Sequence, residues 1–244
     1  MISRTSFYAV AFRLKKLRCE GESKIMISKC FFLREFLGCV LVFNLSCLSN
    51  EPITSDEAME RLEQGQARFL ADKPTPHVIG MKERMKLAME QHPFAIILTC
   101  ADSRVTPELI FDQGPGSLFV LRVAGNISEP GVVGSIEYAA KHLRCPLVVV
   151  LGHEGCGAVK SAMHLEEVHG QLGALIDQVR LAKSIAGDPE ATLRASVDTN
   201  VLYHAEDLRH KSALINDLIG SGKLHVKSAT YAIDSGRVRW LQRN

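Results

Sequence analysis

Residues 94–104 have the sequence FAIILTCADSR, in which a short apolar, β-branched run ends directly in a cluster of thiol and charged side chains. A second stretch, 146–157 (PLVVVLGHEGCG), repeats the arrangement, with His153 and Cys156 after its apolar run. Apolar runs of this length, each followed by a helix start, predict strands that are buried on both faces of a parallel sheet. These two stretches therefore decide the fold class and mark where chemistry is expected.

Strands and helices alternate outward from these two stretches. We predict strands at 94–99, 117–122, 146–151 and 224–233, with 237–241 pairing back on the last as a hairpin. We predict helices at 54–70, 82–91, 132–142, after Gly155, and at 165–185 and 191–220. This alternation indicates an α/β fold, with a mostly parallel central sheet flanked by helices. In such sheets ligands bind beyond the carboxyl ends of the strands, where Cys100 and His153 both lie.

Two thiols, an imidazole and a carboxylate at these strand ends form a candidate zinc site. Thiolate and imidazole suit zinc, which takes four tetrahedral ligands, and Cys100, His153 and Cys156 supply three of them. Asp102 can be the fourth ligand, which closes the metal. If Asp102 instead pairs with Arg104, the fourth position opens to water, whose pKa zinc lowers toward neutrality. The residues by themselves leave both arrangements open.

Length and composition fit one folded domain. A chain of 244 residues with 46% hydrophobic and 23% charged residues is ordinary for a globular protein with a sizeable core. The formal net charge is +2, and residues 1–35 hold eight basic and three acidic residues, which leaves 21 basic and 24 acidic residues for the rest. This mildly acidic body argues against nucleic-acid binding. The glycines around His153 match neither dinucleotide-binding nor P-loop patterns, which excludes a typical nucleotide site.

The first 49 residues predict a signal peptide or N-terminal extension, followed by a domain over 50–244. An apolar run at 36–48 follows basic residues and is too short to span a bilayer, which is typical of a secretory signal peptide. We therefore expect a periplasmic protein with no membrane span in its mature chain; the alternative is a cytoplasmic one. Four of the seven cysteines lie in this segment, and Cys145 is expected to be an inert buried thiol.

From about residue 54 to 241 the sequence resembles the β-class carbonic anhydrases. Four motifs carry the resemblance: CADSRV at 100–105, FVLRVAGN at 119–126, GSIEYA at 134–139 and GHEGCGAV at 152–159. The resemblance implies a zinc enzyme that interconverts carbon dioxide and bicarbonate by attack of zinc-bound hydroxide. It also implies one zinc ion per chain and a homodimer or a dimer of dimers.

The resemblance also implies roles for the residues of the two clusters. Cys100, His153 and Cys156 match the constant zinc ligands of the family. Asp102 and Arg104 match its catalytic pair, in which the aspartate binds zinc in the closed, inactive form.

Four further positions are implied to bind substrate: Gln91, Phe119, Tyr138 and Gly157. Gln91 matches a substrate-orienting glutamine, and the two aromatic residues match pocket-lining positions that are often contributed across a dimer interface. The backbone N–H of Gly157 is expected to face the substrate. Ile97 stands where some bacterial members carry the tryptophan of a regulatory bicarbonate site. We therefore expect no such site here, and an open active site at neutral to alkaline pH.

Two other functions fit the same residues. One is a carbon disulfide hydrolase of the same fold, and the other is a non-catalytic module with a structural zinc ion. Arg104 and Gln91 argue against the structural zinc, because a closed structural site needs neither. Outside the two clusters, His204 and His210 stay open as proton relays.

Overall fold

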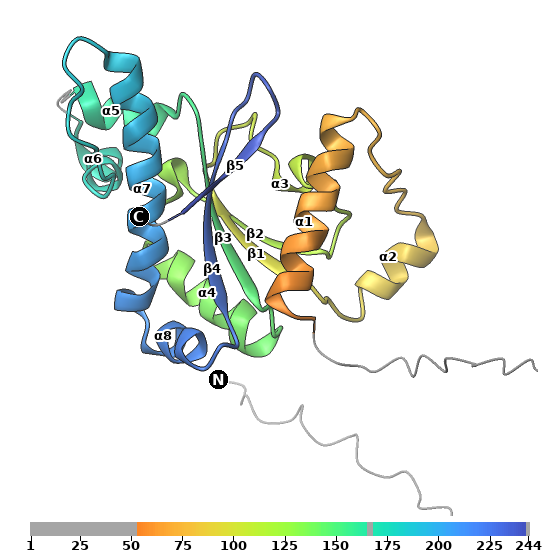
Figure 1. Cartoon of the computed structure of the whole chain (residues 1–244). Helices are drawn as coiled ribbons and strands as arrows, with labels where there is room; N and C mark the ends of the chain where they lie inside the picture. Colours follow the sequence, from red (N-terminus) through yellow and green to blue (C-terminus); the bar gives the residue numbers. More distant parts are fainter. Residues whose placement is uncertain (1–52, 165–167, 243–244) are drawn as a thin grey trace, which may run out of the picture. The chain divides into compact units, whose positions relative to one another are not determined.

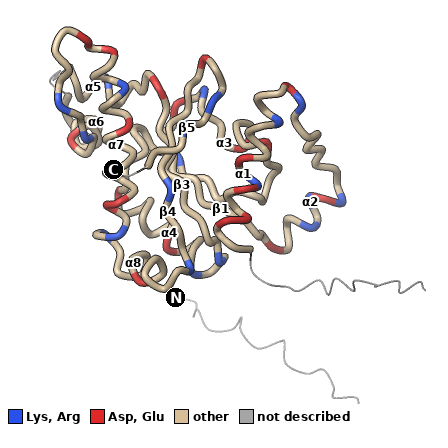
Figure 2. Tube along the Cα trace, in the orientation of Figure 1, with Lys and Arg blue, Asp and Glu red and all other residues tan. Residues whose placement is uncertain are grey.

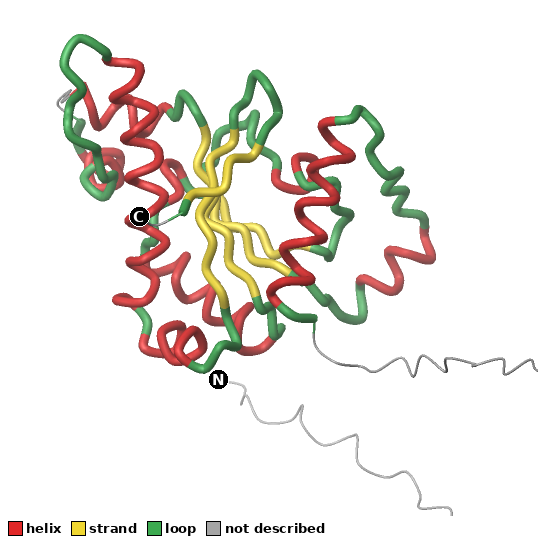
Figure 3. Tube along the Cα trace, in the orientation of Figure 1, coloured by secondary structure: helices red, strands yellow, loops and turns green. Residues whose placement is uncertain are grey.

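The computed structural model describes residues 53–164 and 168–242, which lie in the second of two units of the chain, Met1–Ser49 and Asn50–Asn244. The predicted presequence lies outside the described residues and stays a prediction. A five-stranded sheet forms the centre of the described part, with helices on both of its faces (Figures 1 and 3). The predicted α/β fold is confirmed.

The sheet has the strand order β2-β1-β3-β4-β5. Its strands are β1 (Ala95–Thr99), β2 (Leu118–Arg122), β3 (Leu147–His153), β4 (His225–Tyr231) and β5 (Val238–Leu241). The pairs β1–β2, β1–β3 and β3–β4 are parallel, whereas β5 runs antiparallel to β4, as the predicted hairpin requires. The carboxyl ends of β1 and β3 therefore meet at one edge of the sheet.

Helices cover the two faces of the sheet in two groups. The helices are α1 (Ser55–Leu70), α2 (Met81–Leu87), α3 (Pro107–Ile110), the 3-10 turn η1 (Ala124–Asn126), α4 (Pro130–His142), α5 (Gly157–His164), α6 (Gly170–Ile176), α7 (Pro189–Lys211) and α8 (Ala213–Gly220). Side chains of β1 alternate between the groups: Ile96 and Leu98 pack with α4, α7 and α8, whereas Ala95 and Ile97 pack with α1 and α3. Each fully buried isoleucine or leucine side chain among them stabilises the fold by about 1.5–3 kcal/mol.

The helix α1 begins at a capping box formed by Thr54 and Glu57. The Glu57 N–H donates to Thr54 Oγ1 at 3.2 Å, and the Thr54 N–H donates back to the Glu57 carboxylate at 2.8 Å. Its apolar side carries Ala58 and Leu62, both fully buried against the sheet. At Gly65 a Cβ atom would lie 1.8 Å from the carbonyl oxygen of Phe111, so only glycine lets α1 approach α3 this closely.

The second predicted helix is shorter than expected. We predicted 82–91, whereas α2 is Met81–Leu87 and none of its residues is buried. Because no packing contact rewards a longer helix, it ends at Ala88, well before Pro93.

The prediction of one helix over 165–185 is wrong. The helix α6 covers only Gly170–Ile176, and 177–188 is largely irregular; residues 165–167 lie outside the described residues. Polar side chains of α7 accept the backbone N–H groups of Arg180, Ala182 and Ile185. These hydrogen bonds replace the ones that a helix would make.

The predicted helix 191–220 is two helices, α7 and α8. Between them Ser212 has extended backbone angles, and its Oγ accepts the Ile215 N–H at 3.0 Å. The same hydroxyl donates to Glu137 of α4 at 2.5 Å. The break therefore depends on a contact with another helix, with no proline or glycine to signal it.

No helix within 53–164 or 168–242 has the length and hydropathy that a bilayer span requires. Acidic and basic residues are mixed along α1 and α2 (Figure 2). This mixture fits the nearly balanced charge of the described part of the chain.

Candidate metal centre

Cys100, His153 and Cys156 meet at the carboxyl edge of the sheet. Cys100 follows β1 directly, His153 is the last residue of β3, and Cys156 lies in the turn that leads into α5. Gly155 allows that turn with a φ of +67°, which side chains rarely tolerate. All three side chains are buried, and their ligand atoms lie within 4.8 Å of one another. The structure therefore brings together the three ligands that the sequence predicts.

The geometry of these atoms fits a tetrahedral zinc ion. The two sulfur atoms are 3.9 Å apart, and two thiolates at about 2.3 Å from one zinc ion are separated by about 3.8 Å at the tetrahedral angle. The Nδ1–H of His153 donates to the carbonyl oxygen of Glu154 at 3.0 Å, which leaves the lone pair on Nε2. That Nε2 atom is buried without a hydrogen-bond partner. A metal ion bound here would satisfy it.

The two thiols of the centre differ in their surroundings. Cys100 Sγ accepts the backbone N–H of Gly125 at 3.4 Å. The neighbouring Cys156 thiol and this N–H lower the pKa of Cys100 against the effect of burial. The contact with the Cys100 thiol, together with burial, raises the pKa of the Cys156 thiol. One thiolate is thus favoured without a metal, and coordination to a metal ion would deprotonate the other thiol. By contrast, burial alone raises the pKa of Cys145 to about 12, as an inert thiol requires.

Asp102 is bound to Arg104 by a bidentate ion pair. Arg104 Nε donates to Oδ1 at 2.9 Å and Nη2 donates to Oδ2 at 2.7 Å, while the Arg104 backbone N–H donates to Oδ1 at 3.0 Å. The guanidinium holds the pKa of Asp102 well below its usual range. The Oδ2 atom also lies 3.8 Å from His153 Nε2, so the carboxylate stands beside the metal position. Arg122 fixes this loop by donating to the carbonyl of Asp102 at 2.6 Å.

Among the four predicted substrate-binding residues, only Gly157 lies at the metal centre of its own chain, as the first residue of α5. Phe119 and Tyr138 form a ring pair with centroids 6.3 Å apart on β2 and α4. Phe119 lies beside Ile96 in the sheet, before the carboxyl end of β1. Tyr138 is 48% exposed.

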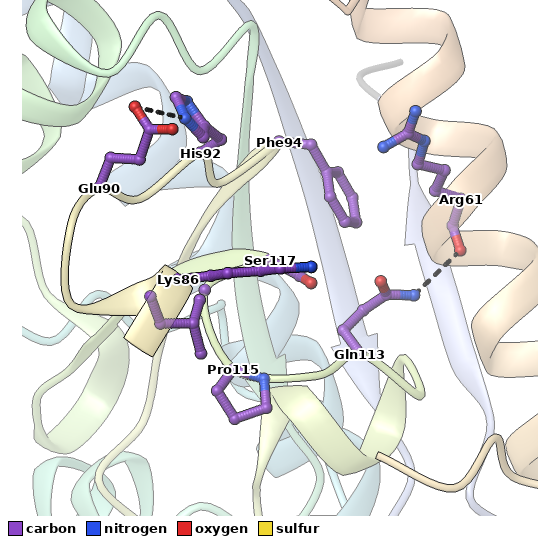
Figure 4. A pocket seen from close by; sticks show the side chains of 10 residues that line it. Arg61, Lys86, Glu90, His92, Phe94, Gln113, Pro115 and Ser117 are labelled. Atoms are coloured by element: carbon purple, nitrogen blue, oxygen red, sulfur yellow. Dashed lines mark hydrogen bonds and ion pairs between the residues drawn. The ribbon is translucent and has the colours of Figure 1, made fainter. Parts of the chain in front are cut away.

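Gln91 lies at the opposite end of β1 from Cys100. The length of β1, about 16 Å at 3.3 Å per residue, separates the two ends of this strand. The neighbours of Gln91, Glu90 and His92, line a pocket of about 360 Å³ beside Phe94 (Figure 4). None of the metal ligands lines this pocket. Within one chain Gln91 therefore does not reach the metal centre.

Sequence reasoning missed two residues that contact the centre or support it. Gly125 was noted only as part of the motif at 119–126, although its N–H reaches Cys100. Asn200, on α7, donates through Nδ2 to the Gly125 carbonyl at 2.8 Å. No pattern connects positions 75 residues apart in the chain, so only the fold reveals this contact.

The metal centre and the fold agree with the comparisons to known proteins. Residues 95–238 match the family described as "Carbonic anhydrase". Carbonic anhydrase 2 of Mycobacterium tuberculosis is 39% identical over 187 residues, which cover 74% of this chain and 89% of the relative. The chain belongs to the carbonic anhydrase family. Carbonic anhydrases catalyse the hydration of carbon dioxide, so the predicted enzyme class is confirmed and neither alternative function is favoured.

Solved structures place the chain in the β class of the family. The β-carbonic anhydrase of Coccomyxa, in complex with acetazolamide, superimposes with a TM-score of 0.60 at 26% identity, covering 75% of this chain and 84% of that one. A tetrameric β-carbonic anhydrase of Sordaria macrospora gives 0.58 at 25% identity, covering 73% and 92%. The predicted β-class fold is therefore confirmed.

Proposed function

We propose that this β-carbonic anhydrase hydrates carbon dioxide reversibly with one zinc ion per chain, held by Cys100, His153 and Cys156. The observation that carries the proposal is the buried, unpartnered Nε2 atom of His153, which faces two sulfur atoms at tetrahedral spacing. When bound, zinc supplies hydroxide near neutral pH by lowering the pKa of a coordinated water.

Asp102 and Arg104 then control the fourth position of the metal. Arg104 engages both carboxylate oxygens, which favours an open position over ligation by Asp102. The carboxylate stays ionised and lies beside His153 Nε2, so its Oδ2 can accept and orient a proton of the reacting water. Gly157 adds a backbone N–H as the first residue of α5, a position whose N–H has no partner inside the helix and can face an oxyanion.

A second copy of the chain is needed to complete the substrate site. Gln91 lies far from the metal centre of its own chain, and β2 is an edge strand with apolar side chains that are only half-buried. Such an edge favours pairing with another chain. We therefore propose a homodimer, or a dimer of dimers, in which Gln91 of one chain reaches the metal centre of the other. The tetrameric relative from Sordaria macrospora supports this assembly.

Stopped-flow carbon dioxide hydration, with zinc content measured on the same sample, tests the function. We expect activity at one zinc per chain across pH 7 to 9, and inhibition by acetazolamide, which the Coccomyxa relative binds. Zinc-loaded protein without activity at any of these pH values would contradict the proposal and favour a structural metal.

The N-terminal segment leads to a separate proposal, export to the periplasm. The apolar run at 36–48 supports cleavage near residue 49. N-terminal sequencing of protein from fractionated bacterial cells tests this: a mature chain in the periplasm is expected. An uncleaved chain in the cytoplasm would contradict it.

A further inference from the structure

Three polar side chains of α7 hold the irregular segment 177–188. They are spaced four residues apart, so they lie on one face of the helix. Thr192 Oγ1 accepts the Ile185 N–H at 2.9 Å, Ser196 Oγ accepts the Ala182 N–H at 3.2 Å, and Asn200 Oδ1 accepts the Arg180 N–H at 2.9 Å. All three side chains are buried.

Asn200 differs from the other two because it also reaches the metal centre. Its Nδ2 donates to the Gly125 carbonyl at 2.8 Å, and the Gly125 N–H donates to Cys100 Sγ at 3.4 Å. The two contacts fix the positions of Oδ1 and Nδ2 in the Asn200 amide. The backbone N–H of Arg180 needs an acceptor, and the carbonyl of Gly125 needs a donor. Neither aspartate in its ionised form nor an apolar residue can serve both partners.

Gly125 needs such an anchor. Its φ of +72° lies in the left-handed region, and glycine moves freely between this region and others. Asn200 fixes the carbonyl of Gly125, while the N–H of Gly125 points at Cys100 Sγ. The turn is held separately at Ser128, whose N–H donates to His204 Nδ1 at 3.1 Å. Loss of the Asn200 contact therefore frees Gly125 without releasing the whole turn.

We propose that Asn200 is a positioning residue for the metal centre, which holds Gly125 so that its N–H donates to the Cys100 thiolate. The proposal rests on the proposed zinc enzyme and extends it to a residue that touches neither metal nor substrate. Hydrogen bonds to metal ligands orient the ligand and tune its charge, and their loss weakens metal binding or activity by about 10–100-fold.

Asn200→Asp is the sharpest test, because it keeps an acceptor for Arg180 and removes the donor to Gly125. Ser196→Ala and Thr192→Val are the matched controls on the same helix face. Ser196→Ala removes one hydrogen bond to the segment, and Thr192→Val removes the contacts of Thr192 Oγ1 with Ile185 and Asp188. Full-length protein is titrated with zinc against a competing chelator. The cobalt-substituted proteins are compared by their thiolate-to-cobalt charge-transfer absorption, which reports on the sulfur ligands.

We expect Asn200→Asp to bind zinc about tenfold or more weakly than the wild type and to shift the cobalt absorption. The two controls are expected to lose thermal stability while keeping wild-type zinc affinity and absorption. The rise in melting temperature on zinc addition separates weaker zinc binding from a general loss of stability. A general loss of stability lowers the melting temperatures of both the metal-free and the metal-bound protein. If Asn200→Asp fails to fold, Asn200→Ala takes its place with the same readouts, since it also lacks the donor.

Zinc affinity and cobalt absorption in the Asn200 variant that match those of Ser196→Ala would overturn the inference. Wild-type protein that binds zinc but does not hydrate carbon dioxide would refute the proposed function, and the inference would still be decided by metal binding alone. Wild-type protein that binds no zinc would refute both.

Discussion

At the scale of single residues, Arg104 decides where the Asp102 carboxylate lies. Arg104→Ala removes both prongs of the ion pair, so we expect Asp102 to turn toward the metal and hydration activity to fall about 10–100-fold. Asp102 stays ionised across pH 6.5 to 9 even at its ordinary pKa, so the loss reflects its position and not its protonation. Stopped-flow kcat/KM over this pH range is the measurement. Full activity of Arg104→Ala at every pH would remove the pair from the mechanism.

The ligand set is tested by comparing two buried cysteines. Cys100→Ser replaces a ligand and is expected to leave the purified protein nearly free of zinc, because thiolate is a far better zinc ligand than hydroxyl. Cys145→Ser is the matched control, since Cys145 is equally buried and donates only to the carbonyl of Pro93, at 3.0 Å. Elemental analysis of both variants gives the zinc per chain. Equal zinc in the two would contradict the assignment.

The sequence predicts the residues that hold the metal better than those that support them. Cys100 and His153 could be placed together because both follow apolar runs whose parallel pairing brings their carboxyl ends to one edge. Asn200 could not be placed, since its two contacts are with backbone atoms far away in the chain. Gln91 was assigned to the site by resemblance, and its position at the other end of β1 keeps it away from the metal centre of its own chain.

At the scale of helices, the break between α7 and α8 depends on one serine. Ser212→Ala removes the side-chain cap of α8 and the contact with Glu137, so we expect a loss of about 1–2 kcal/mol in the free energy of unfolding. Urea unfolding measures the loss. Ser221→Ala, at the exposed other end of α8, is the control and is expected to change stability little. The sequence could not predict this break, because the partner that stabilises it lies on α4.

The helix α7 also carries a pH response. Burial lowers the pKa of His204 to about 4, while its Nδ1 accepts the Ser128 N–H. The unfolded chain binds a proton at this residue below about pH 6.5, whereas the folded chain does so only near pH 4. The contribution of His204 to the stability of the fold is therefore complete above pH 6.5 and is lost as the pH falls.

We expect about 2 kcal/mol of this stability to disappear between pH 7.5 and pH 5. His204→Gln should be less stable than the wild type at pH 7.5, but its free energy of unfolding should fall less on acidification. The free energy of unfolding is measured in excess chelator, so that zinc release does not contribute. His210→Gln removes an exposed histidine from the same helix as a control. An unchanged slope in His204→Gln would show that other groups cause the response. The burial of His204 also argues against a role as a proton relay to solvent.

At the scale of the whole molecule, the assembly can be tested by mixing two inactive chains. His153→Ala lacks a metal ligand, and Gln91→Ala lacks the proposed contribution to the partner. In a mixed dimer one site carries both changes and the other carries neither. Random exchange makes half of the dimers mixed, so about a quarter of the sites regain full function. Activity of the mixture that equals the mean of the two separate proteins would show that each chain works alone.

The order of strands in the sheet has a consequence for how the protein folds. The metal ligands come from segments that are 53 residues apart along the chain, at Cys100 and His153, and they meet only when β1 and β3 pair. Parallel strand pairing closes long loops and is slow compared with helix formation. The nascent or refolding chain can therefore present at most two of its three ligands together, His153 and Cys156, until β1 and β3 pair. A complete metal site would therefore form only after β1 and β3 pair, and a bound metal ion would then stabilise that pairing.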